Sequence, residues 1–181
     1  VFTLLILMTL GFVDFARAFS QMNTAEKATQ IGVRAAIITD PVREELADFD
    51  CDTNSITLGT ACSDPGAGTF GTIACNGSSS SCTSGGISGG NTFDATAFGT
   101  ILSRMQVVYP GLQASQVIVE YRDVRLGFAG REAPVPAVTV RLNSIPFNFL
   151  TLNTLLGLPT ITMPDFRATL IGEDLTAAGR S

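Results

Sequence analysis

The sequence predicts an α+β protein in which a long N-terminal helix, at about residues 1–39, carries a small head. We expect the head to contain a second helix and a three- to four-stranded antiparallel sheet. Three observations support this class. Residues 1–39 lack a proline or a glycine-rich break, apolar residues recur at helical spacing after residue 92, and the last third is rich in β-branched and aromatic runs. A chain of 181 residues is long enough for one such core.

We divide the chain into three predicted regions. Residues 1–40 form a helix for a membrane or a filament core, residues 41–92 form a disulfide-stapled, Gly/Ser-rich loop region, and residues 93–181 form an α/β head. The first 13 residues are apolar and uncharged, but a helix of that length rises only about 20 Å, against about 30 Å for a hydrocarbon core. Continued to Thr39, the helix would be a rod of roughly 55–60 Å. Because the sequence starts with Val1 inside the apolar run, we expect a processed N-terminus.

Two stripes of side chains follow one another along this predicted helix. The first is large and partly aromatic, the second is small, and both repeat every three or four residues, which places each stripe on one face. Because small side chains let another backbone approach closely, we expect the second stripe to pack tightly. The large stripe comprises Phe12, Phe15, Phe19 and Met22, and the small stripe comprises Ala25, Ala28, Gly32, Ala35 and Ala36.

Asp14 and Arg17 interrupt an otherwise apolar stretch that ends at Phe19. Since an unpaired ion is costly in apolar surroundings, we expect these two side chains to pair with each other or with opposite charges on a neighbouring subunit. An equal alternative is an interfacial pair whose side chains extend to lipid headgroups.

All four cysteines, Cys51, Cys62, Cys75 and Cys82, lie in the region that is rich in Gly, Ser, Thr and Asp. An even number of cysteines in an apolar-poor segment predicts disulfides and an oxidising compartment. Among the three possible connectivities we favour Cys51 with Cys62 and Cys75 with Cys82, because each bond closes a short loop. A zinc site is disfavoured, since the spacings are not CxxC-like and the chain has no histidine. We expect an irregular, solvent-facing loop region here.

Asp48, Asp50 and Asp52 alternate along the acidic start of this region, as oxygen ligands do at the start of a calcium loop. An EF-hand needs Gly at its sixth position and Glu at its twelfth, where this sequence has Thr53 and Gly59. The three aspartates are therefore a weak calcium candidate, and the competing interpretation is a solvated acidic turn.

After Thr92 the sequence changes to apolar residues at helical spacing. We expect a second amphipathic helix with Thr92 as its N-cap, ending at Tyr109-Pro110-Gly111. Four later segments predict three or four antiparallel strands packed on the helices, because they are β-branched and aromatic and are bounded by Gly, Pro and Asn. The helical positions are Phe93, Ala97, Ile101, Met105 and Val108, and the strand segments are VIVEYRDV, PAVTVRLN, PFNFLTL and ITMPDFRATLIG.

Composition argues against nucleic-acid binding and against common enzyme chemistry. The formal net charge is -5 and the 11 basic residues are scattered, whereas nucleic-acid binding needs a clustered basic patch. The absence of histidine removes the commonest general base and the usual transition-metal ligands. We therefore expect no enzyme activity, no cofactor and no nucleic-acid partner.

The N-terminal residues resemble a known family. GFVDFAR at 11–17 is similar to an apolar-helix motif, G-[IV]-[ED]-[FY]-[GA]-R, and ATQIGVRA at 28–35 is similar to A-x-x-[GA]-x-R-x-A. Both motifs are typical of TadE/TadG-like proteins of the bacterial tight-adherence (Tad) pilus system, within the type IV pilin superfamily. VPAVTVRL and ITMPDFRATLIGEDL also resemble the closing strands of that family.

This resemblance implies a pilin-like subunit that is cleaved by a prepilin peptidase, held in the inner membrane, and polymerised with copies of itself by the pilus assembly machinery. Its final location would be an extracellular filament at the cell surface. The acidic residue that pilins carry near the mature N-terminus is missing, since position 5 is Leu5, so either cleavage occurs further along or Asp14 takes over its role. The expected assembly interface comprises Leu5, Leu10, Phe12, Asp14, Phe15, Arg17 and Phe19.

Two alternative functions follow from the same features. The chain could be a single-anchor periplasmic protein, either a minor pseudopilin or a pilus assembly factor. It could also be a secreted adhesin-type binding module whose stapled loop contacts a ligand. Both alternatives keep the α+β fold, and they differ from the first prediction in whether copies of the helix polymerise.

Overall fold

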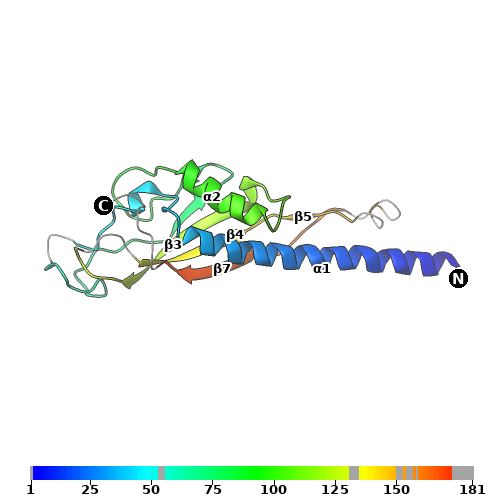
Figure 1. Cartoon of the computed structure of the whole chain (residues 1–181), viewed down its shortest axis with the longest axis horizontal. Coiled ribbons are helices and arrows are strands. Elements are labelled where there is room, and N and C mark those ends of the chain that lie inside the picture. The colour runs from blue at the N-terminus through cyan, green and yellow to red at the C-terminus, as the bar shows by residue number, and fades with distance from the viewer. Residues whose placement is uncertain are drawn as a thin grey trace.

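One long helix, α1 (Phe2–Ala36), projects from a head that lies along its C-terminal part (Figure 1). The computed structural model describes residues 2–52, 56–130, 135–149, 153, 157 and 159–172. At 1.5 Å per residue, the 35 residues of α1 extend about 52 Å. The helix ends close to the predicted Thr39, because the ring of Pro41 disfavours a helical conformation at the residue before it.

The second helix, α2 (Ala95–Gln106), begins later than predicted. Its N-cap is Asp94, whose carboxylate accepts hydrogen bonds from the backbone N–H groups of Thr96 (2.7 Å) and Ala97 (3.0 Å). The prediction that Thr92 caps this helix was wrong, because the Thr92 hydroxyl donates to Glu45 instead. The residues that face the core are Ala97, Phe98, Ile101 and Met105.

The head is built on a five-stranded sheet in which every neighbouring pair is antiparallel, with the strand order β2-β1-β3-β4-β7. Two single-turn 3-10 helices and a separate two-stranded sheet accompany it. This layout confirms the predicted α+β class. The strands are β1 (Ile73–Asn76), β2 (Ser81–Cys82), β3 (Val117–Leu126), β4 (Val135–Leu142) and β7 (Phe166–Ile171), the separate pair is β5 (Pro146–Phe147) with β6 (Ile161–Thr162), and the 3-10 helices are η1 (Glu44–Leu46) and η2 (Ala114–Gln116).

The prediction of an irregular loop over residues 41–92 was wrong for residues 73–82. Strand β1 lies next to β3, with Ile73 opposite Tyr121 and Cys75 opposite Val119. Ile73 and Cys75 point inward and are fully buried. The sheet therefore has five strands instead of three or four, and part of the Gly/Ser-rich region belongs to the head.

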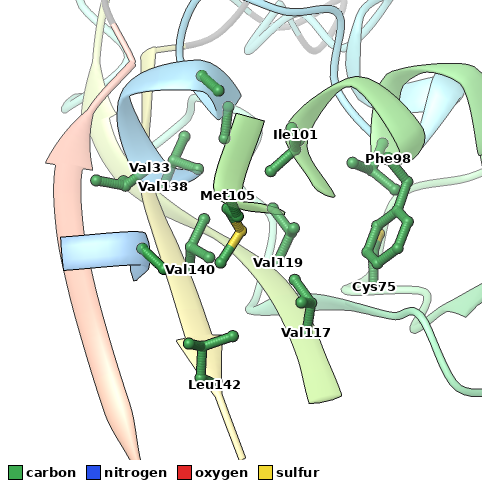
Figure 2. Close-up of a cluster of buried hydrophobic side chains, with 14 of the residues drawn as sticks. Val33, Cys75, Phe98, Ile101, Met105, Val117, Val119, Val138, Val140 and Leu142 are labelled. Atoms are coloured by element: carbon green, nitrogen blue, oxygen red, sulfur yellow. The ribbon is translucent and has the colours of Figure 1, made fainter. Parts of the chain in front are cut away.

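Helices α1 and α2 pack on one face of this sheet, and α1 also contacts β4 and β7. Figure 2 shows Val33 of α1 and Met105 of α2 directed toward the inward-facing residues of β3 and β4. The small stripe permits this approach, since a Cβ atom at Gly32 would lie 2.6 Å from the Met105 Sδ. The inward strand residues are Val117, Val119 and Tyr121 on β3, and Val138, Val140 and Leu142 on β4.

Candidate functional site

The projecting half of α1 exposes its largest apolar side chains. From Ala25 onward one side of the helix is buried in the head, whereas the preceding 20 or so residues span about 30 Å, which equals the thickness of a hydrocarbon core. Among the described residues, α1 is the one helix that is long and apolar enough to cross a membrane, over Leu5–Ala36 and by length and composition alone.

Five of these exposed residues form a continuous stripe, which we name the apolar seam: Leu5, Met8, Phe12, Phe15 and Phe19. Their side chains are 58–70% exposed. The spacings of three, four, three and four residues match the a and d positions of a heptad repeat, in which a narrow apolar stripe packs along a second helix. The seam therefore offers an exposed apolar surface of a kind that lipid or a second helix can cover.

The charge pair lies on the opposite side of the helix from the seam. Asp14 is two residues from Phe12, which is roughly half a turn, and its side chain has no exposed surface. Arg17 Nη1 lies 3.5 Å from Asp14 Oδ1, while the Arg17 side chain is 42% exposed. The two side chains thus pair within one helix, as one of the sequence-based alternatives expects.

The structure divides the seven predicted assembly residues into two groups. Leu5, Phe12, Phe15 and Phe19 share the exposed seam. Leu10, Asp14 and Arg17 lie away from it, and Leu10 is half-buried. Met8 belongs to the seam but was absent from the predicted interface. Its position seven residues before Phe15 was the sequence signal that could have identified it.

The cysteines form two sequential disulfides, Cys51–Cys62 and Cys75–Cys82. The second bond joins directly opposed residues of β1 and β2 and is buried under Phe98, so it lies in the head core and not in a solvent-facing loop. The first bond closes the loop that follows the acidic run.

The three predicted calcium ligands do not surround a common point. The Asp50 carboxylate accepts hydrogen bonds from the backbone N–H groups of Asp52 (3.0 Å) and Gly130 (3.0 Å). Asp48 and Asp52 are exposed. Within the part of the chain that the structure describes, no group of three His, Cys, Asp or Glu residues is placed to hold a metal ion. Asp50 therefore serves as a backbone cap that links two loops.

Sequence reasoning missed Arg43, which has no exposed surface. Its Nε atom lies 3.3 Å from Glu45 Oε2, and its two terminal nitrogens donate to backbone carbonyls of the segment that precedes α2. The acidic run around Arg43 suggested an exposed side chain, and no local signal could have located acceptors 40 to 47 residues away. These acceptors are the carbonyl oxygens of Thr83 (3.1 Å), Ser84, Ile87 (3.4 Å) and Gly90 (3.0 Å).

Two neighbouring groups complete this polar cluster. Burial raises the pKa of Glu45, but hydrogen bonds from the Thr92 hydroxyl and backbone outweigh burial and lower the pKa to about 2. The Tyr121 hydroxyl accepts a hydrogen bond from the Val42 backbone N–H (2.9 Å), and its burial raises the pKa of Tyr121. The segment after α1 is therefore fastened to the sheet on one side and to the loop before α2 on the other.

Comparison with protein families matches residues 1–34 to the family described as TadE-like protein. No curated protein and no solved structure gives a significant match. The matched range contains all of GFVDFAR and all but the last residue of ATQIGVRA, and it lies almost entirely within α1. The N-terminal helix of this chain is therefore similar to that of TadE-like proteins, which confirms the predicted resemblance over these residues.

Proposed function

We propose that this chain is a structural, pilin-like subunit that resides in the bacterial inner membrane and polymerises into an extracellular filament through the apolar seam. The observation that supports the proposal most is the seam itself, a heptad-spaced stripe of side chains that are 58–70% exposed. The match to the TadE-like family, whose pilus proteins are structural, supports the same class of function.

Burial of the seam supplies the driving force for assembly. Covering one large apolar side chain stabilises by roughly 1.5–3 kcal/mol relative to leaving it in water. While α1 is in the membrane, lipid provides this cover. Once the helix leaves the bilayer, its apolar surface needs another partner, and other copies of the seam offer one of matching shape.

A single-anchor periplasmic role is the main alternative, as a minor pseudopilin or an assembly factor. It is favoured by the length and composition of α1, which suffice for one membrane crossing.

An adhesin-type role is a second alternative. Deleting residues 51–82 would be a poor test of adhesion, because β1 and its buried disulfide belong to the sheet. Substitution of the exposed Leu58 inside the first disulfide loop is a better probe.

The test uses the full chain, expressed together with a Tad pilus machinery, carrying Phe12→Ala and Phe15→Ala. We expect filaments to disappear from electron micrographs while the chain remains in the membrane fraction, because alanine keeps α1 helical and uncharged. The matched control is Leu7→Ala with Leu10→Ala, which removes apolar side chains from outside the seam.

Normal filaments from the phenylalanine variant would contradict polymerisation through the seam. A wild-type chain that stays in the membrane and never enters filaments would favour the single-anchor alternative.

A further inference from the structure

The connection between β4 and β7 is a hairpin that contains β5 and β6 and carries no charge. From Leu142 to Pro164 the sequence has no Asp, Glu, Lys or Arg. The two charged residues that bound this stretch, Arg141 and Asp165, form an ion pair at 2.9 Å. The charges therefore lie at the base of the hairpin. We name residues 143–149 and 159–164 the uncharged arm.

The two halves of the uncharged arm hold each other together. Strands β5 and β6 pair antiparallel. The backbone N–H of Met163 donates to the carbonyl of Ile145 at 2.8 Å. The hydroxyl of Thr160 donates to the side-chain oxygen of Asn148, so these two polar side chains satisfy one another. The arm thus meets part of its hydrogen-bonding demand without water.

The uncharged arm extends on the side of the head from which α1 projects. Figure 1 shows β5 running beyond the five-stranded sheet on that side. Phe147 of the arm belongs to the core cluster, and Phe149 packs against this cluster, as do Ala18 and Met22 of α1. The two phenylalanine rings meet edge to face, with their centroids 5.1 Å apart. The arm is therefore rooted in the core and points toward the apolar half of α1.

The burial of Asp14 leads to the same placement. Its side chain has no exposed surface, whereas Val13 and Phe15 on either side of it are 54% and 70% exposed. Side chains project outward from a helix, so a bare helix leaves part of each one uncovered. Part of the head therefore reaches along α1 as far as Asp14.

A part of the head that follows α1 in this direction meets the bilayer. The helix enters the bilayer where it leaves the head, because roughly the 20 residues before Ala25 match the thickness of a hydrocarbon core. The absence of charged side chains removes the largest cost of moving the arm out of water. A two-stranded ribbon still has edge N–H and C=O groups that hydrocarbon cannot satisfy. The favourable depth is therefore the boundary between headgroups and acyl chains.

We propose that the uncharged arm is a second membrane contact of this chain, and that it lies in the boundary of the bilayer nearest the head, with Ile161 against the acyl chains. The inference rests on the proposed function, which places α1 in the membrane. Ile161 is large and apolar but 45% exposed, and lipid removes this surface from water. Because the arm has no charge, the contact needs no particular headgroup charge.

Tryptophan fluorescence tests this contact, because the chain has no tryptophan of its own. Full chains carrying Ile161→Trp are reconstituted in phosphatidylcholine vesicles whose acyl chains are brominated either near the headgroup or near the bilayer centre. Bromine quenches tryptophan that lies close to it. We expect the lipid brominated near the headgroup to reduce the fluorescence several-fold, and the lipid brominated near the centre to reduce it much less.

Three further variants frame this measurement. Phe12→Trp, in the apolar seam, reports whether α1 is in the bilayer. Phe128→Trp is the matched control, since Phe128 is 50% exposed and follows the end of β3 that is roughly 30 Å from the end nearest the arm. It should not be quenched by either lipid. Thr162→Trp, on the other face of β6, repeats the test without changing Ile161, which stands opposite Phe147.

The inference is overturned if both arm variants are quenched no more than Phe128→Trp while Phe12→Trp is quenched, and the membrane residence of α1 then still stands. It is also overturned if Ile161→Trp has blue-shifted emission that neither lipid quenches, because a protein surface, such as a second copy, then covers the arm. An unquenched Phe12→Trp would refute the membrane residence of α1 and, with it, the arm contact.

Discussion

Replacing Arg43 with methionine should destabilise the head strongly. The side chain is fully buried, its Nε pairs with Glu45, and its terminal nitrogens donate to four backbone carbonyls between residues 83 and 90. Methionine replaces the aliphatic part of the arginine side chain but has no guanidinium and no donor, so it leaves all of these acceptors without their partner.

The magnitude follows from the number and type of these bonds. A hydrogen bond from a charged donor contributes about 1.5–3 kcal/mol, but the contributions do not add. Several of the carbonyls belong to exposed residues, such as Ser84 and Gly90, and regain water once the guanidinium is gone. We therefore expect the free energy of unfolding to fall by about 3–5 kcal/mol, as when one member of a buried ionic cluster is removed.

Urea unfolding of the full chain in detergent measures this loss. The chain has no tryptophan, so the fluorescence of its two tyrosines, Tyr109 and the buried Tyr121, reports on the head, where both lie. The unfolding free energy of Arg43→Lys should lie between those of wild type and Arg43→Met. An ammonium group is a compact point charge, so it cannot reach the carbonyls on both sides that the guanidinium reaches. Arg104→Met, at an exposed site on α2, controls for the loss of one positive charge.

Hydrogen exchange adds a local readout, because the segment 83–92 should lose protection in Arg43→Met before the rest of the head does. A fall of less than about 1 kcal/mol, on the scale of an ordinary surface substitution, would refute the role assigned to Arg43. So would unchanged exchange over this segment.

Two other contacts of the same cluster give further predictions. Tyr121→Phe removes the acceptor of the buried Val42 N–H and should lower the unfolding free energy by about 1–3 kcal/mol. Tyr109→Phe serves as the control. Equal losses in the two variants would contradict a stabilising role for the bond between Val42 and Tyr121. Glu45 has an ordinary pKa of 4.5 that is lowered to about 2 in the head, so its contribution to stability is complete above pH 4.5 and is lost as the pH falls toward 2. The difference in unfolding free energy between wild type and Glu45→Gln, measured by urea unfolding at a series of pH values, should therefore shrink as the pH falls from 4.5 toward 2. A difference that is constant with pH would contradict the stabilising role of the Glu45 carboxylate.

Much of the fold could be predicted from the sequence because the relevant signals are local. An uninterrupted run without helix breakers predicts α1, and runs of β-branched and aromatic residues predict β3 and β4. Strand β1 was missed because Ile73 and Cys75 are its sole inward residues, in surroundings of Gly, Ser and Thr that favour loops. Its place in the sheet depends on Tyr121 and Val119, more than 40 residues away.

In the candidate site, too, local spacing predicted some features and contacts between distant residues decided others. Spacing along the chain placed Phe12, Phe15 and Phe19 on one face, but it could not tell which face the head would cover. Packing of α1 against α2, β4 and β7 left the seam exposed, and the Asp14 side chain on the other side of the helix is buried in the structure.

The sequence by itself determined the rod, its apolar N-terminal half and the shared face of Phe12, Phe15 and Phe19, since helix propensity and side-chain periodicity act over a few residues. The tertiary structure alone decided that Arg43 is buried, that the Cys75–Cys82 bond lies in the core, and that Arg141 and Asp165 pair at the base of the uncharged arm. These arrangements join residues distant in sequence, and strand pairing and core packing bring such residues together where local pattern cannot.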